Sequence, residues 1–203
     1  MSACPRVVLA TRNAHKIVEL KEILSSAGLA LDLVGVQAFP AVPDVAETGA
    51  TFAENALLKA RTVAEATGLP SVADDSGLCV DALGGMPGVL SARWAGRHGD
   101  DLANMNLVLA QVSEVPDERR GARFVCAAAL ALPGRQQWVV EGVLPGRLER
   151  APRGDGGFGY DPILRPDGEN RTTAEMSAQE KNAISHRGRA FRQLAPHLRA
   201  LRG

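Results

Sequence analysis

The run TRNAHK, residues 11–16, directly follows the apolar segment Val7–Ala10. If that segment is a strand and a helix begins after Asn13, free backbone N–H groups and the positive end of the helix dipole meet at the junction and favour an anion. Thr11 and Asn13 can add neutral hydrogen-bond donors, and Lys16 can add a positive charge. Two interpretations remain open: a helix start capped by Asn13 with the basic side chains in solvent, or a phosphate site.

A second group of residues is acidic. Asp74 and Asp75 follow Ser71–Ala73, which we predict to be a short buried strand. Carboxylates at the carboxyl end of a strand open into the crevice where α/β sheets place ligands, and such oxygen ligands suit Mg²⁺ or Mn²⁺. An isolated Asp-Asp pair is more often a turn or a helix cap, so the metal site depends on a neighbouring phosphate loop. Because neighbours on a strand point to opposite faces, we expect one aspartate to face the site.

The segment RGDGGFGYDP, residues 153–162, contains a formal match to GxGxxG. It does not indicate a dinucleotide site, because no strand enters it, Pro162 follows it and no helix opens from it. The alternatives are a flexible loop that brings N–H groups and the Phe158 and Tyr160 rings to a flat ligand, or an ordinary glycine loop with one ring packed inward.

The segment KNAISHR places Lys181, His186 and Arg187 within about two helical turns. Such residues are usually exposed to solvent when they occur singly. A weaker alternative is a helix that contacts nucleic acid.

Hydrophobic patterning predicts alternating strands and helices, and therefore an α/β fold around a largely buried sheet. Two S/T-x-x-E capping boxes, at Thr51 and Ser177, mark helix starts. The predicted strands are Val7–Ala10, Leu31–Val36, Ser71–Ala73, Arg123–Leu132 and Gln137–Val143. The predicted helices are Ala14–Ala27, a helix from Thr51 to Gly68, Leu102–Val112 and a basic tail from His186 to Arg202.

The composition excludes several classes of protein. The 203 residues are 45% hydrophobic, enough for one domain or two small lobes, and 23 basic residues balance 23 acidic ones, so no broad basic field favours nucleic acid. No apolar run is long enough to span a membrane, and we expect a soluble, cytoplasmic protein without a membrane or nucleic-acid partner. Three widely spaced cysteines indicate neither a zinc site nor disulfides.

Taken in order, these segments resemble the inosine triphosphate pyrophosphatase family, which acts on nonstandard purine nucleoside triphosphates. The match runs from TRNAHK through TFAENALLKA, VADDSGLCVDALGGMPGVLSARWAG and GGFGYDPI to AEMSAQEKNAISHRGRA. It covers nearly the whole chain. Each segment is a weak signal alone, but five in the same order are specific.

The resemblance implies one domain over residues 1–203, with a two-lobed α/β fold around a long mixed sheet flanked by helices and an active site in the cleft between the lobes. It implies a homodimer that cleaves ITP, dITP and XTP to the monophosphate and pyrophosphate. It also implies a requirement for Mg²⁺, with Mn²⁺ as a possible substitute, and a role in removing deaminated purines from the nucleotide pool.

The resemblance also implies roles for individual residues of this chain. Metal ligands would be Glu47 and Asp75, with Asp75 also the general base. The phosphate-binding residues would be Thr11, Arg12, Asn13, Ala14, His15, Lys16 and Lys59. Contacts with the rest of the substrate would come from Ser76, Phe158, Gly159, Tyr160, Asp161, Lys181, His186 and Arg187.

This chain departs from the family in its first loop, where other members often carry small residues and this one has Arg12 and His15. We therefore expect no glycine-dependent tight turn there, and Arg12 either contacts phosphate or points outward. Two other functions stay open: a nucleotide-sensing module that binds without hydrolysis, and a septum-inhibitor-type nucleotide pyrophosphatase with a different base preference.

Overall fold

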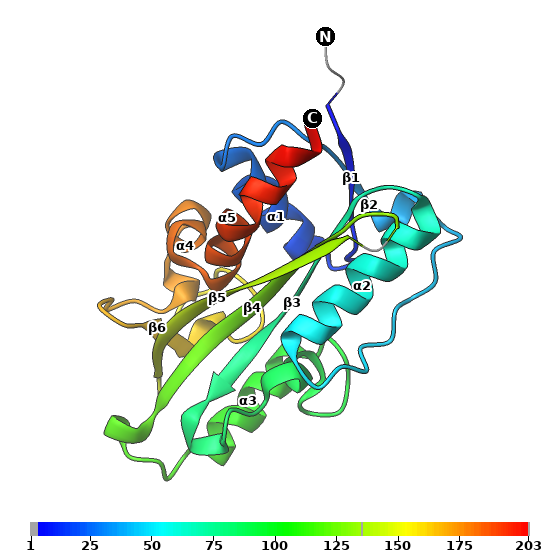
Figure 1. The fold of residues 1–203 in the computed structure, drawn as a ribbon. Coiled ribbons are helices and arrows are strands. Elements are labelled where there is room, and N and C mark those ends of the chain that lie inside the picture. The colour runs from blue at the N-terminus through cyan, green and yellow to red at the C-terminus, as the bar shows by residue number, and fades with distance from the viewer. Residues whose placement is uncertain (1–3, 135, 203) are drawn as a thin grey trace. The chain divides into compact units, whose positions relative to one another are not determined.

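The computed structural model describes residues 4–134 and 136–202, and within them the strands form one sheet in the order β2-β1-β3-β4-β5-β6 (Figure 1). The strands are β1 (Arg6–Leu9), β2 (Asp32–Gly35), β3 (Ser71–Val80), β4 (Gly121–Ala131), β5 (Gln137–Leu148) and β6 (Leu164–Pro166). The α-helices are α1 (Ala14–Ser26), α2 (Phe52–Thr67), α3 (Asp101–Gln111), α4 (Ala178–Ile184) and α5 (His186–Arg199). β1 pairs in parallel with β2 and β3, whereas β5 and β6 are antiparallel, so the predicted mixed α/β sheet is confirmed.

The chain divides into two compact units. Unit 1 contains Met1–Asp75, Cys126–Gly142 and Arg187–Gly203, and unit 2 contains Ser76–Val125 and Val143–His186. The long strands β3, β4 and β5 each contribute residues to both units, and each unit has a hydrophobic core of its own.

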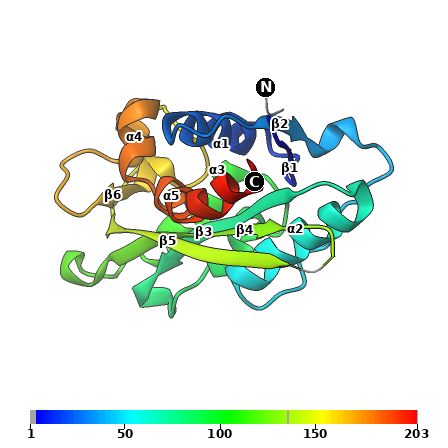
Figure 2. The ribbon, with the colours of Figure 1, turned by 45° about the horizontal axis from the view of Figure 1, so that its top comes forward.

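The core of unit 1 lies between the sheet and two helices that are far apart in the sequence. Leu20 and Leu24 of α1 pack with Phe191 and Leu194 of α5 against buried strand residues such as Val7. Figure 2 shows α1 and α5 on one face of the sheet and α2 on the other. Side chains of this part of β3 therefore meet different helices on its two faces, which decides the partners of the aspartates.

The core of unit 2 forms around α3. Met105 and Val108 of this helix pack with Leu78 of β3, Phe124 of β4 and Leu144 of β5. Apolar residues at helical spacing on one side of α3 meet apolar residues of the strands, which is the usual way that an amphipathic helix covers a sheet. This core supports the glycine loop that follows β5.

The prediction of a short strand over Ser71–Ala73 is wrong, because β3 continues to Val80 and carries Asp74 and Asp75 in its interior. The two polar residues interrupt the apolar pattern, but basic side chains bury and neutralise both carboxylates, so the strand stays inside the protein. β1 stops opposite Val72, so the aspartates extend past the carboxyl end of the neighbouring parallel strand. They still lie at the edge where α/β folds place ligands.

The other predicted elements are found with shifted ends. The predicted strand Gln137–Val143 continues as β5 to Leu148, with buried and exposed residues alternating in its second half. The basic tail forms α5 and then a 3₁₀ turn over Ala200–Arg202. The capping box at Ser177 is confirmed, and the helix it starts, α4, ends at Ile184.

Thr51 caps α2 as predicted, since its hydroxyl accepts a hydrogen bond from Glu54 N at 3.1 Å. The Glu54 carboxylate bonds to Ala50 N, one residue earlier than in a standard box. We expect Thr51→Ala to lower the free energy of unfolding by about 1 kcal/mol, because one N–H of the first turn loses its acceptor. Urea denaturation measures the change. Thr51→Ser, which keeps the hydroxyl, is the control, and an equal loss in both variants would contradict the assignment.

Candidate active site

The loop between β1 and α1 has the geometry of a capped helix start. Asn13 is the N-cap, and its side chain accepts a hydrogen bond from Lys16 N at 3.2 Å. Thr11 Oγ1 accepts one from Asn13 N at 3.2 Å, while Ala14 and His15 are exposed. Asn13 is therefore the N-cap, as the helix-cap interpretation predicts, but that interpretation is wrong about Lys16, whose side chain is only 15% exposed and pairs with Asp74. The cap is compatible with an anion site, because it occupies only part of the N–H groups of the first turn.

Arg12 points away from the helix start. Its Nε lies 2.5 Å from Asp44 Oδ1, and its Nη2 donates to Val42 O at 3.1 Å. Of the two roles open to Arg12, the structure shows the outward one, in which the guanidinium joins the first loop to the loop before α2.

Asp74 lies between two cations from the helices on its own face of the sheet. Its Oδ2 is 3.0 Å from Lys16 Nζ of α1 and 3.2 Å from both Nε and Nη2 of Arg187 of α5. Arg187 also pairs with Glu19 of α1. Burial alone would raise the pKa of Asp74, but Lys16 and Arg187 outweigh burial and hold this pKa well below its ordinary value. Asp74 is therefore a buried anion that orients the ammonium of Lys16.

Asp75 contacts the helix on the opposite face. Its Oδ1 lies 3.5 Å from Lys59 Nζ, and its Oδ2 accepts a hydrogen bond from Asn55 Nδ2 at 3.1 Å. The same ammonium lies 2.5 Å from Glu47 Oε1. Burial, with a further contribution from Glu47, raises the pKa of Asp75 even though Lys59 acts in the other direction. A buried carboxylate with a raised pKa is a candidate general base.

Glu47 and Asp75 converge on one position, which the ammonium of Lys59 shares. Burial would lower the pKa of Lys59, but Asp75 and Glu47 outweigh burial and raise it. Within residues 4–134 and 136–202 no group of three or more His, Cys, Asp or Glu side chains forms a site for a metal ion. Two carboxylates that attract a cation are nevertheless a suitable donor set for Mg²⁺, which completes its octahedral shell with water and substrate phosphate oxygens.

In unit 2 the carboxylate of Asp161 organises the glycine loop. Its Oδ2 accepts hydrogen bonds from Phe158 N and Lys181 Nζ, both at 2.8 Å, and its Oδ1 accepts one from Thr173 Oγ1 at 2.8 Å. Gly157 has φ +72°, and a Cβ there would lie 2.1 Å from Asp161 Oδ2, so only glycine fits. Asp161 is thus buried behind the loop, where it fixes the ammonium of Lys181 at 5.0 Å from the centre of the Phe158 ring.

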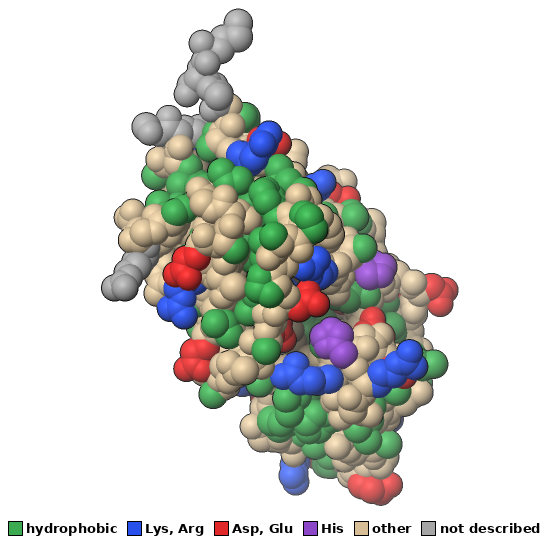
Figure 3. Space-filling model, turned by 90° about the vertical axis from the view of Figure 1, so that its right-hand side faces the viewer, with side chains coloured by type: hydrophobic (Ala, Val, Ile, Leu, Met, Phe, Trp, Pro, Cys, Tyr) green, Lys and Arg blue, Asp and Glu red, His purple; other side chains and the backbone are tan. Residues whose placement is uncertain are grey.

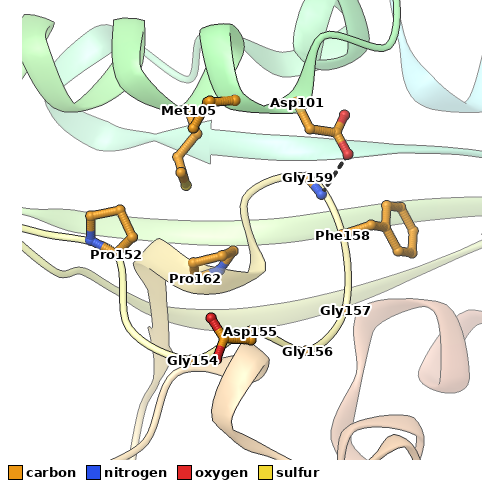
Figure 4. Close-up of a pocket in the computed structure, with 11 residues that line it drawn as sticks. Asp101, Met105, Pro152, Gly154, Asp155, Gly156, Gly157, Phe158, Gly159 and Pro162 are labelled. Atoms are coloured by element: carbon orange, nitrogen blue, oxygen red, sulfur yellow. Dashed lines mark hydrogen bonds between the residues drawn. The ribbon is translucent and has the colours of Figure 1, made fainter.

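The two aromatic rings of this loop differ in their surroundings. Tyr160 is buried and its hydroxyl donates to Ser91 O at 2.8 Å, whereas Phe158 is half-buried. Figure 4 shows the Phe158 ring directed away from Met105 and Pro162, which line a pocket of about 380 Å³ behind the loop. One ring of the loop is therefore packed inward, while the other, that of Phe158, is half-buried and lies under the ammonium of Lys181; binding of a flat ligand at this ring stays a prediction.

Three further residues of the predicted site, Gly159, His186 and Ser76, lie in different segments of the protein. Gly159 N donates to Asp101 Oδ2 at 2.9 Å, which joins the loop to α3 (Figure 4). His186 is buried and stacks on Phe124 with ring centres 4.9 Å apart. Ser76 follows Asp75 on β3 and is half-buried.

Comparison with known proteins identifies the family. The sequence model of the Ham1 family matches residues 7–197. The chain belongs to the Ham1 family. It is 68% identical over 198 residues to a dITP/XTP pyrophosphatase of Streptomyces coelicolor, covering 98% of this chain and 99% of that protein. It is 56% identical over 202 residues to one of Mycobacterium tuberculosis, covering 99% and 98%.

Solved structures agree with this assignment. The nucleoside-triphosphatase / dITP/XTP pyrophosphatase of Mycobacterium abscessus is 54% identical with a TM-score of 0.77, covering 94% of this chain and 99% of that one. A HAM1 protein from Coxiella burnetii is 43% identical with a TM-score of 0.87, covering 97% and 99%. The resemblance found in five sequence segments is therefore confirmed.

Sequence reasoning missed several residues that hold this Ham1-family site. Asn55 contacts Asp75, Glu19 contacts Arg187, and Thr173 contacts Asp161. A signal for Asn55 was present, because it lies four residues before Lys59 and so on the same face of α2. Glu19 is 168 residues from Arg187, so no spacing rule identifies this pair.

Proposed function

We propose that this chain hydrolyses dITP, XTP and ITP to the nucleoside monophosphate and pyrophosphate. The observation that carries the proposal is that the carboxylates of Glu47 and Asp75 both contact the ammonium of Lys59. Asp75 lies on β3, where this strand extends past the end of β1. A protein that only senses nucleotides gains little from two carboxylates near a triphosphate. The dITP/XTP pyrophosphatases to which the chain is 56–68% identical support the same activity.

The carboxylates of Glu47 and Asp75 would hold Mg²⁺, or Mn²⁺ in its place, which supplies charge neutralisation of the triphosphate and polarises the phosphoryl group. Asp75 orients a water and accepts its proton. Thr11, Asn13 and the amide groups of the first turn of α1 bind the phosphates, and Lys16 balances the charge that develops on pyrophosphate. Lys59 exchanges its carboxylate partners for phosphate oxygens when the nucleotide binds.

Base selection follows from hydrogen-bond polarity. Hypoxanthine and xanthine carry an acceptor oxygen at C6, which the ammonium of Lys181 can satisfy, whereas adenine presents an amino group there. A donor facing a donor can reject the wrong substrate by about 10⁴-fold. We assign the contact with O6 to Lys181, because its ammonium lies 5.0 Å from the centre of the Phe158 ring, on which the base would stack.

We expect Phe158→Ala to raise KM for ITP by about 5–150-fold, because base–aromatic stacking contributes about 1–3 kcal/mol. Steady-state kinetics with ITP measure the change. Phe158→Tyr keeps a stacking ring and should keep a KM close to the original value. An unchanged KM in Phe158→Ala would exclude stacking on this ring.

The experiment that tests the function is pyrophosphate release from ITP, dITP, XTP, GTP, ATP and dTTP, each with Mg²⁺ and with EDTA. Mg²⁺-dependent turnover of ITP, dITP and XTP with little turnover of ATP supports the proposal. Preference for dTTP would favour the septum-inhibitor-type enzyme, and binding without turnover would favour the sensing module.

The resemblance further leads us to propose a cytoplasmic homodimer, which light scattering tests for its oligomeric state. Binding to nucleic acid is disfavoured by the zero net charge, and on the face drawn in Figure 3 acidic and basic side chains are interspersed. Among the described residues, none of the helices has both the length and the hydropathy that crossing a membrane requires.

A further inference from the structure

Asn55 joins the two segments of unit 1 that carry the carboxylates. It lies in α2 and its side chain is fully buried. Its amide nitrogen donates to Asp75 Oδ2 at 3.1 Å, and its carbonyl oxygen accepts a hydrogen bond from Gly49 N at 2.7 Å. Glu47 is two residues before Gly49 on the same loop. One amide group therefore contacts both β3 and the loop of Glu47.

Gly49 shows how closely this loop approaches the helix. A Cβ at Gly49 would lie 2.7 Å from Glu54 Cβ and 2.8 Å from Asn55 Oδ1, both too close for any real contact. The loop can therefore reach the carbonyl of Asn55 only if residue 49 has no side chain. Together the glycine and the amide fix how far the backbone near Glu47 lies from β3.

We infer that Asn55 is a positioning residue, which fixes the carboxylates of Glu47 and Asp75 at the separation that the metal ion requires. The inference rests on the proposed function. An amide is the side chain that suits this place, because it donates to a carboxylate and accepts from a backbone N–H at the same time. Residues that orient metal ligands in this way typically change metal affinity or activity by about 10–100-fold when they are replaced.

The role of Asn55 differs from that of a buried asparagine that only supports the fold. Asn104 of α3 provides the comparison: it is also buried, its Oδ1 accepts from Ala95 N at 2.7 Å and its Nδ2 donates to Ala92 O at 3.2 Å. Each asparagine joins its helix to two other segments through two side-chain hydrogen bonds. Only Asn55 has a carboxylate among these partners.

The test compares Asn55→Leu with Asn104→Leu in the full chain. Leucine has a similar size and makes neither hydrogen bond, so both variants should be less stable in thermal denaturation. Titration with Mn²⁺, followed by electron paramagnetic resonance without nucleotide, measures metal affinity directly. We expect the Kd for Mn²⁺ to rise about 10–100-fold in Asn55→Leu and to change less than about twofold in Asn104→Leu.

Steady-state kinetics provide a second test of the role of Asn55. In Asn55→Leu the Mg²⁺ concentration for half-maximal activity should rise, and excess Mg²⁺ should recover part of the lost kcat, which a purely structural defect would not show. If Asn55→Leu does not fold, Gly49→Ala replaces it. A Cβ at residue 49 would be too close to Glu54 Cβ and Asn55 Oδ1, so the loop of Glu47 must move relative to Asn55, and the same rise in Kd is expected.

If folded Asn55→Leu or Gly49→Ala binds Mn²⁺ with a Kd within about twofold of the wild-type value, the positioning role of Asn55 is wrong, even if the enzyme is active. An equal loss of Mn²⁺ affinity in Asn104→Leu also overturns it, because stability alone would then explain the effect. A wild-type protein that hydrolyses none of the nucleotides would instead contradict the proposed function, so the two failures are distinguishable.

Discussion

Replacing Asp75 with asparagine should lower kcat for ITP by about 10²–10⁴-fold, the range that a general base contributes to catalysis. Asparagine keeps the shape of the side chain but cannot accept the proton of the attacking water. It would also leave Glu47 as the one charged side chain of the proposed pair of metal ligands. Binding of ITP, measured by calorimetry on the variant itself, should survive, because Thr11, Asn13 and Lys16 are unchanged.

The matched control for this variant is Asp81→Asn. Asp81 follows β3 directly, is exposed and pairs with Arg123, so its replacement should leave kcat within about twofold of the original. Near-normal turnover in Asp75→Asn would show that another group activates the water. Loss of ITP binding in that variant would show that Asp75 acts mainly in binding the substrate.

Replacing Asp74 with asparagine should lower the free energy of unfolding by about 3–5 kcal/mol, because removing one partner of a buried ion pair leaves the other charge uncompensated. Lys16 and Arg187 both lie against the same oxygen of Asp74. Arg187 would keep its ion pair with Glu19. Urea denaturation followed by circular dichroism measures the loss.

Asp44→Asn is the control for this prediction. Asp44 also pairs with an arginine, Arg12, but its side chain is 86% exposed, whereas that of Asp74 is 0% exposed. Exposed ion pairs contribute about 0–1 kcal/mol, so the control should change stability little. Similar small effects in both variants would mean that solvent reaches Asp74 and that it does not hold the buried cations.

These two predictions assign different roles to Asp74 and Asp75, which are adjacent on β3. Alternation along β3 directs Asp74 to α1 and α5 and Asp75 to α2. Asp74 has two close cations and a lowered pKa, which suits a permanent anion. Asp75 shares one cation with Glu47 and has a raised pKa, which suits a group that accepts a proton. The difference lies in the helices that cover the two faces, since the side chains are chemically the same.

The alternation of strands and helices, the family and the capped start of α1 could all be predicted from the sequence. Each depends on short-range information: hydrophobic period, the S/T/N caps and motifs in order along the chain. Asn13 caps α1 and Thr51 caps α2 because a cap needs only residues three positions apart.

The length of β3 and the partners of its two aspartates depend on contacts between segments that are distant in the sequence. Asp74 and Asp75 interrupt an apolar pattern, so a rule based on hydrophobicity ends the strand at Ala73. Salt bridges from Lys16, Lys59 and Arg187 allow the strand to continue, and these residues are up to 113 positions away. The role of Asn55 could not be predicted from the sequence for the same reason. It depends on contacts with Gly49 and Asp75, which exist only once the helix, the loop and the strand are packed together.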